Sequence, residues 1–452
     1  MPSGNAGLNA PGLPQNRDMW RIAVPMILSN ISVPLLGMVD TGVTGHLDNP
    51  AYLGAVAIGA TIFTFIYLGM NFLRMGTTGI TAQQFGDSDH DGLRSALGQA
   101  LIVGFVVALA LIALQVPIEV IALRLIGGEP ETQAFAAEYF SIRIWSAPGT
   151  LANFALIGWF LGLQNARVPL FIFLTINITN IVLDLVFVVL LGMTVDGVAL
   201  ASVIAEYAGL FVGASFAVAA LRIHEGRWLP ERLTNFDAYR AFFSINANIF
   251  IRTMALMFTL AFVTAQSARL GPLVLAANAV LMNFQHLTSF GLDGLAHAAE
   301  ALVGKAVGQR SRKALVHAVN LTLKWSLIFA AGFTVFYIVA GELIIATLTD
   351  IDDVRETARR YLPWMIASPM VSVWCFLYDG VYIGATRARA MRNIMLFSTL
   401  IVFLPAWYLA QPYGNDGLWF AFLLFMASRG VGMHIIYRQK IVRGVLGPNV
   451  AQ

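Results

Sequence analysis

Acidic side chains inside long apolar runs are the residues of this sequence best suited to chemistry, because a buried carboxyl group can bind and release a proton. Asp40 and Asp184 both lie in such runs in the first half of the chain. Asn180 precedes Asp184 by one helical turn, so the amide can donate a hydrogen bond to the carboxylate. Burial disfavours a charged carboxylate, so two acids facing one cavity can take up a proton near neutral pH. Alternatively, each acid has only a structural role and accepts hydrogen bonds from polar neighbours.

Other residues of the same half are candidates for the lining of a cavity around these acids. Polar side chains extend the hydrogen-bonding network, and an unbranched methionine adapts to apolar molecules of different shapes. The candidates are Asn153, Asn177, Ser202, Glu206 and Met38. For Met38, packing or lipid contact is the alternative. Pro25 and Pro34 precede Asp40 in the same run and predict a bend in the helix, either a fixed kink or a hinge.

The second half carries a different set of charges at membrane depth. Arg252, Asp293, Glu300 and Asp379 all lie in apolar runs, and His297 stands between Asp293 and Glu300. An ionisable group inside the membrane is a functional candidate, since it is costly to keep there. The alternative is a structural ion pair of Arg252 with Asp379 or with Asp293.

The composition indicates that these residues lie on membrane-spanning helices. Of 452 residues, 58% are hydrophobic and 12% charged, about half the charged fraction of a soluble protein. This excludes an ordinary soluble enzyme, a disordered chain and a disulfide scaffold. Cys375 is the only cysteine, which excludes an intrachain disulfide, and a net charge of +3 gives no indication of nucleic-acid binding. No nucleotide-binding loop or hydrolase motif occurs where it would act, so we expect neither an enzyme nor a cofactor.

Long apolar runs predict twelve spans, each of roughly 20 residues or more. They lie near 20–45, 53–82, 94–123, 134–164, 168–193, 197–221, 238–268, 274–304, 314–341, 357–385, 392–411 and 417–437. Eighteen of the 28 Lys and Arg residues fall in loops on the side of the N-terminus and five on the other side. Positive loops stay in the cytoplasm, so both termini are predicted to be cytoplasmic.

The two halves of the chain resemble each other in one constant register. The matching pairs include Pro50 with Pro272, Gly86 with Gly308, Tyr139 with Tyr361, Gly158 with Gly380 and Arg167 with Arg389. An even number of spans per half gives both halves one orientation, a design known from transporters. We therefore predict an all-α membrane protein with two pseudo-symmetric six-helix lobes. The predicted divisions are a flexible tail 1–16, an N-lobe 17–222, a linker 223–237, a C-lobe 238–438 and a tail 439–452.

Several stretches resemble the multidrug and toxic compound extrusion (MATE) family, and most of all its DinF branch. They are PMILSNISVPLLGMVDTGVTGHL at 25–47, the stretch 52–86, NIVLD at 180–184 and LYDGVYIGATRARAMRN at 377–393. The resemblance covers nearly the whole chain. It implies twelve helices around a V-shaped cavity, and export of drug-like, often cationic compounds driven by protons or sodium ions.

The resemblance also assigns roles to individual residues. Asp40 and Asp184 match the acidic pair of proton-coupled members, with Asn180 as their partner, and Ser202 matches a small hydroxyl residue of span 6. Asp379 matches the acid of a C-lobe cation site, but Arg252 stands in span 7 where sodium-coupled relatives carry an acid. This departure favours protons over sodium.

A proton-coupled multidrug exporter of the bacterial inner membrane, acting as a monomer, is therefore the prediction. Its partners are small drug-like or cationic molecules and the lipid bilayer, and its coupling ion is H⁺, with Na⁺ possible. The alternatives are a sodium-coupled exporter, a flippase for lipid-linked oligosaccharides and a membrane scaffold without transport.

Overall fold

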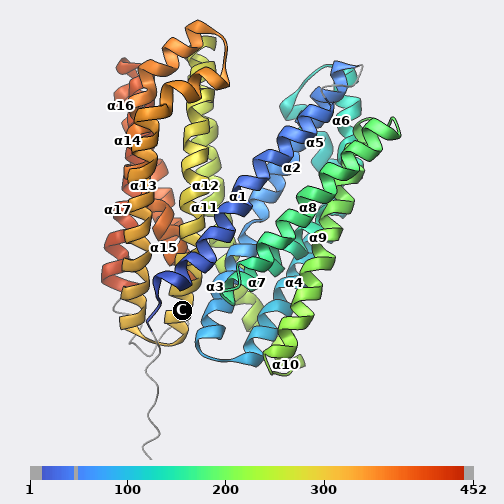
Figure 1. Ribbon diagram of the computed structural model, residues 1–452, viewed down its shortest axis with the longest axis vertical. Helices are drawn as coiled ribbons and strands as arrows, with labels where there is room; N and C mark the ends of the chain where they lie inside the picture. Colours follow the sequence, from blue (N-terminus) through green and yellow to red (C-terminus); the bar gives the residue numbers. More distant parts are fainter. Residues whose placement is uncertain (1–12, 45–48, 442–452) are drawn as a thin grey trace, which may run out of the picture.

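The chain folds into two bundles of helices that meet at one end and diverge toward the other (Figure 1). The computed structural model describes residues 13–44 and 49–441, with the side chains of all of these except residues 33–38, 40, 41, 238, 241, 440 and 441. The secondary structure of the described residues is helical, with no strand among them. This confirms the predicted all-α fold.

The first bundle, the N-lobe, is built from the first six predicted spans. Its helices are α1 (Asn16–Thr44), α2 (Pro50–Met70), α3 (Phe72–Gly86), α4 (His90–Ala113), α5 (Gln115–Ile126), α6 (Pro130–Arg143), α7 (Ala147–Gly162), α8 (Arg167–Asp184) and α9 (Val195–Ile223). Four spans consist of consecutive segments. One cause is proline: Pro117 has no N–H to donate to the carbonyl of Ala113, and α4 ends at that residue.

The second bundle, the C-lobe, follows a short linker helix, α10 (Pro230–Leu233). It contains α11 (Phe236–Arg269), α12 (Pro272–Gly308), α13 (Arg312–Leu348), α14 (Asp352–Gly384), α15 (Ala388–Phe397), α16 (Leu404–Ala410) and α17 (Asn415–Ile436). The segment between α15 and α16 is a π-helical stretch, so these two helices form one span. Each of the twelve predicted runs thus corresponds to one helix or one interrupted helix.

Ten of these spans are long and apolar enough to cross a membrane, judged on the described residues alone. The other two are α1, some of whose side chains are not described, and α12. α12 has 37 residues, enough to span, but carries polar residues along much of its length. α12 is therefore a spanning helix whose polar side chains need hydrogen-bonding or ionic partners inside the protein.

The lobes meet at the end that carries Arg94, Arg232, Lys305 and Arg310, which we call the basic end. Contacts there are close because glycines face backbone of the opposite lobe. A Cβ on Gly86 would overlap the carbonyl oxygen of Lys305, and a Cβ on Gly308 would overlap that of Gln83.

These two contacts are related by the sequence repeat. In the register that pairs Gly86 with Gly308, Gln83 is paired with Lys305. Each lobe therefore presents the same surface to the other, as in a two-fold symmetric interface. The side chain of Gln83 adds hydrogen bonds to the Gly384 carbonyl at 2.9 Å and to the Thr386 hydroxyl at 3.1 Å.

We expect Gly308→Ala to loosen this interface, since overpacking a tight contact costs about 1–3 kcal/mol. The apparent melting temperature of the purified protein should fall by several degrees. Gly332→Ala is the matched control, because nothing lies within 4 Å of a Cβ at that helical position. If both variants melt at the same temperature, the close glycine contact does not hold the lobes together.

Candidate functional site

Asp184 is at the C-terminal end of α8 and is fully buried. Asn180, one turn earlier, is also buried and donates a hydrogen bond to the hydroxyl of Ser202 on α9 at 3.1 Å. Asn180 and Ser202, both predicted to belong to a polar network around Asp184, are thus hydrogen-bonded to each other, and Asp184 lies on the same face of α8 as Asn180. A buried carboxyl group next to amide and hydroxyl groups is suited to exchanging a proton.

α1 lies against α8 and brings the predicted partner acid to a similar depth. Asn177 on α8 donates hydrogen bonds to the Ser32 hydroxyl at 2.9 Å and the Ser32 carbonyl at 3.2 Å. Both helices leave the basic end in the same direction. Asp40 is eight residues beyond Ser32 and Asp184 is seven beyond Asn177, about 12 and 10.5 Å along the respective axes.

For three predicted residues of α1 the structure does not describe the side chains, namely Pro34, Met38 and Asp40. Their roles stay predictions. Pro25 is described: the hydroxyl of Ser29 donates a hydrogen bond to its carbonyl at 2.8 Å, within the helix assigned from Asn16 to Thr44.

A second polar group in the N-lobe joins α7 to α9. The amide of Asn153 donates hydrogen bonds to the carboxylate and to the backbone carbonyl of Glu206, both at 2.9 Å. The guanidinium of Arg143 lies 5.4 Å from the ring centre of Phe63 and 5.7 Å from that of Tyr139. Asn153 and Glu206 thus form a hydrogen-bonded pair between helices, which leaves their predicted cavity role untested.

The C-lobe places two guanidinium groups on one carboxylate. Arg252 on α11 and Arg429 on α17 both donate to Oδ2 of Asp379 on α14, the second at 2.8 Å. Of the two partners left open for Arg252, the structure selects Asp379. Arg429 was not predicted from the sequence, although an arginine within the apolar run 417–437 is itself a signal of a buried partner.

This arrangement bears directly on a cation site at Asp379. A sodium ion would have to share the carboxylate with two buried arginines. The geometry is that of a structural ion-pair network, whose members are expensive to separate.

A third group of charges crosses the boundary between the lobes. Arg74 on α3 of the N-lobe lies 3.8 Å from the carboxylate of Glu300 on α12 of the C-lobe. His297 lies 3.3 Å from the same carboxylate and 3.4 Å from Arg74. Glu300 is 1% exposed and Arg74 7%, so this is a buried contact that joins the lobes.

Asp293 is the remaining acid of the C-lobe set. It makes no ion pair or hydrogen bond within the described part of the chain. Glu300 and Asp379 thus have arginine partners, whereas Asp293 has no guanidinium group within ion-pair distance among the described residues.

Replacing Asp379 by Asn should destabilise the protein strongly, because two buried guanidinium groups lose their counter-ion, at a cost of about 3–5 kcal/mol. The additional change Arg252→Met should recover part of the loss, since only one unpaired charge remains. Thermal unfolding of the purified variants measures both effects. A single variant as stable as the native protein would contradict the ion-pair network.

Comparison with known proteins identifies the family. The MatE family model matches residues 25–186 and 249–408, one stretch in each lobe. DNA damage-inducible protein F of Escherichia coli (strain K12) is 41% identical over 431 residues, which cover 94% of this chain and 92% of that protein. Multidrug resistance protein NorM of Vibrio cholerae is 23% identical over 443 residues, covering 94% and 95%.

Solved structures show the same fold. One described as the outward-facing conformation of a multidrug resistance MATE family transporter superposes with a TM-score of 0.85 at 18% identity, covering 95% of this chain and 96% of that one. A crystal structure of a MATE protein in the straight conformation gives a TM-score of 0.86 at 17% identity, again covering 95% and 96%. The chain therefore belongs to the MATE family of multi-pass membrane transporters, which are not enzymes, and within that family to the branch of DNA damage-inducible protein F.

Proposed function

We propose that this transporter is a proton-coupled antiporter that exports drug-like, often cationic compounds across the bacterial inner membrane. The observation that carries the proposal is the burial of Asp184 beside Asn180 and Ser202, at the depth of Asp40 on the adjacent helix α1. A proton and a cationic substrate would compete for this pair of carboxyl groups. The N-lobe is therefore the proposed coupling site.

The contacts of α1 support a route by which protonation of an N-lobe acid would change the contacts with the C-lobe. On one side α1 binds α8 through Ser32 and Asn177. On the other side, Asn30 donates a hydrogen bond to the Phe290 carbonyl of α12 at 3.2 Å, and Gly294 of α12 packs against Ile27. A rearrangement of α1 on protonation of Asp40 would thus act on both lobes, with Pro25 and Pro34 as the proposed hinges.

The basic end supports an orientation with both termini in the cytoplasm. The lobes meet at that end, where the backbone contacts of Gly86 and Gly308 close the interface. In this orientation the conformation described here opens toward the outside. Protons would enter there, neutralise the acids and expel the substrate; the inward-facing form would then release the proton to the cytoplasm and bind new substrate.

Sodium coupling receives less support from the contacts of the C-lobe. Arg252 and Arg429 already neutralise Asp379, the residue that matches the family's C-lobe cation site. A sodium ion has no acidic partner on α11 at that point, since Arg252 occupies the position. We therefore place the coupling with protons at the N-lobe acids.

Efflux of an organic cation dye from proteoliposomes with an imposed pH gradient tests the proposal. Asp40→Asn and Asp184→Asn should each lower the pH-driven rate more than about tenfold, because an amide does not bind a proton at these pH values. The native rate should not depend on sodium. Glu342→Gln is the matched control, since that acid is exposed on α13 and should leave transport unchanged.

Two results would contradict this proposal. One is normal pH-driven efflux by the double variant Asp40→Asn, Asp184→Asn. The other is efflux that requires sodium at constant pH and survives the change at Asp40, which would move the coupling elsewhere in the protein.

A further inference from the structure

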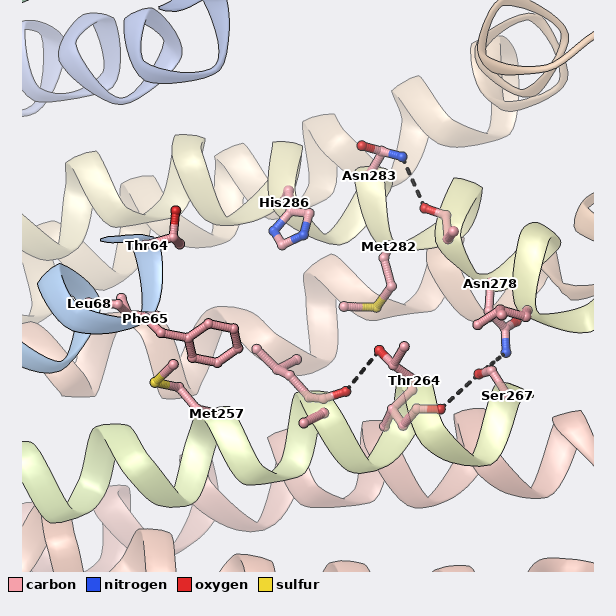
Figure 2. A pocket seen from close by; sticks show the side chains of 15 residues that line it. Thr64, Phe65, Leu68, Met257, Thr264, Ser267, Asn278, Met282, Asn283 and His286 are labelled. Atoms are coloured by element: carbon pink, nitrogen blue, oxygen red, sulfur yellow. Dashed lines mark hydrogen bonds between the residues drawn. The ribbon is translucent and has the colours of Figure 1, made fainter. Parts of the chain in front are cut away.

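A charged pocket of ≈ 680 Å³ lies at the basic end of the N-lobe, where α9 ends and the linker leads to α10 (Figure 1). Its charged lining residues are Arg94 on α4, Arg222 in the last turn of α9 and Glu225 in the linker. Two arginines against one glutamate give the pocket a positive charge. By contrast, the pocket between the lobes in Figure 2 has no Asp, Glu, Lys or Arg among the residues that line it. The pocket beside α9 is therefore the one suited to an anionic group.

The guanidinium group of Arg94 is held in place but keeps donors for a ligand. Its Nη2 donates hydrogen bonds to the carbonyls of Leu221 and His224, the second at 3.2 Å. The ring centre of Trp228 lies 5.9 Å from the guanidinium carbon. Nε is buried without a hydrogen-bond partner, and Nη1 makes no hydrogen bond to any described residue. A fixed guanidinium with free N–H groups is suited to binding a phosphate.

Arg222 is exposed and makes no ion pair or hydrogen bond within the described part of the chain. The acids at the start of α4 are engaged elsewhere. The carboxylate of Asp89 lies 2.7 Å from the guanidinium of Arg232, and that of Asp91 accepts a hydrogen bond from the backbone amide of Arg227 at 2.6 Å. The positive charge of Arg222 is therefore available to a ligand in the pocket.

The pocket lies where the apolar surface of the spans gives way to polar surface. The predicted third span begins at Arg94, and the predicted sixth span ends at residue 221, just before Arg222. Phe211 and Val218 lie on the same face of α9 as Arg222 and are 75% and 53% exposed. Trp228 is 46% exposed, and tryptophan is typical of the membrane interface. A molecule with an anionic head and hydrocarbon chains would contact both the pocket and the apolar face of α9.

From these features we infer that the pocket binds the phosphate headgroup of an anionic phospholipid. The phosphate would accept hydrogen bonds from Arg94 and Arg222, and the acyl chains would lie along Val218 and Phe211. A lipid without net charge is disfavoured because it would leave the excess positive charge uncompensated. A soluble phosphate is disfavoured because it would make no use of the apolar face. The assignment to the cytoplasmic leaflet rests on the proposed orientation, whereas binding itself does not.

A bound phosphate would also strengthen the attachment of the linker to the N-lobe. Gly226 of the linker already packs on the start of α4, where a Cβ would lie 2.9 Å from the carbonyl oxygen of His90. The phosphate would add a bridge between Arg94 of α4 and Arg222 of α9 beside this contact. Because the lipid binds the folded pocket, it should raise the melting temperature of the protein.

Native mass spectrometry of the delipidated protein in detergent tests the inference. The protein is mixed with equal amounts of phosphatidylglycerol and phosphatidylethanolamine that carry the same acyl chains, so that only the headgroups differ. Phosphatidylglycerol should be retained about fivefold better, and Arg222→Gln should lower its retention about fivefold. Arg312→Gln is the matched control, because it removes the same charge from an exposed arginine that begins α13 and does not line the pocket.

Three further measurements separate the site from general effects. Glu225→Gln removes the carboxylate of the pocket and should retain phosphatidylglycerol at least as well as the native protein. Without lipid, Arg222→Gln should melt at the native temperature, whereas the rise in melting temperature on addition of phosphatidylglycerol should be smaller. Glycerol phosphate, which carries the phosphate without acyl chains, should not displace the lipid.

Equal retention of the two lipids by the native protein overturns the inference. An equal loss of phosphatidylglycerol in Arg222→Gln and Arg312→Gln also overturns it, since the overall charge would then account for binding. Displacement by glycerol phosphate would show that the pocket binds a free phosphate instead. None of these results depends on proton coupling, because no transport is measured.

Discussion

The free-energy cost of an uncompensated charge inside the membrane governs the arrangement of this protein. In the C-lobe, that cost is met by arginines: Arg252 and Arg429 bind Asp379, while Arg74 reaches across from the N-lobe to Glu300. In the N-lobe, Asp184 is fully buried one helical turn from Asn180, which donates a hydrogen bond to Ser202. Ion pairs with arginine are fixed parts of a structure, whereas a carboxyl group among neutral polar groups can change its charge by exchanging a proton. The two lobes therefore share a fold but hold their acids differently, and the N-lobe is the proposed coupling site.

The interface of the lobes combines backbone contacts that follow the repeat with charged residues that differ between the two halves. Gly86 and Gly308 occupy equivalent positions of the repeat and make equivalent contacts, so the backbone interface is close to symmetric. The charged contact is not symmetric, because the position equivalent to Arg74 in the second half holds Ala296. Likewise Arg252 corresponds to Asn30, which instead binds the α12 backbone. The backbone contacts between the lobes are therefore close to symmetric, whereas the charged contact between Arg74 and Glu300 is not.

Much of this architecture could be predicted from the sequence, because the bilayer imposes strong patterns. The twelve spans, the even number per half and the repeat all follow from apolar runs and from pairs such as Tyr139 with Tyr361. Which charged side chains form ion pairs with each other is harder to predict. Arg252 was expected to pair, but Asp379 and Asp293 were equally good partners until the structure placed the guanidinium of Arg252 on the Asp379 carboxylate. Arg74 and Glu300 lie in different halves of the chain, and nothing in the local sequence of either points to the other.

The central claim is that a proton and a cationic substrate share the N-lobe carboxyl groups. The most direct measurement is the number of protons released when a saturating organic cation, such as tetraphenylphosphonium, is added to the purified protein in weakly buffered solution with a pH indicator. We predict release of roughly one proton per bound cation, as linkage between two ligands of one site requires. Release should disappear in Asp184→Asn and persist in Glu342→Gln. Cation binding without proton release in the native protein, or release that survives in Asp184→Asn, would contradict the account.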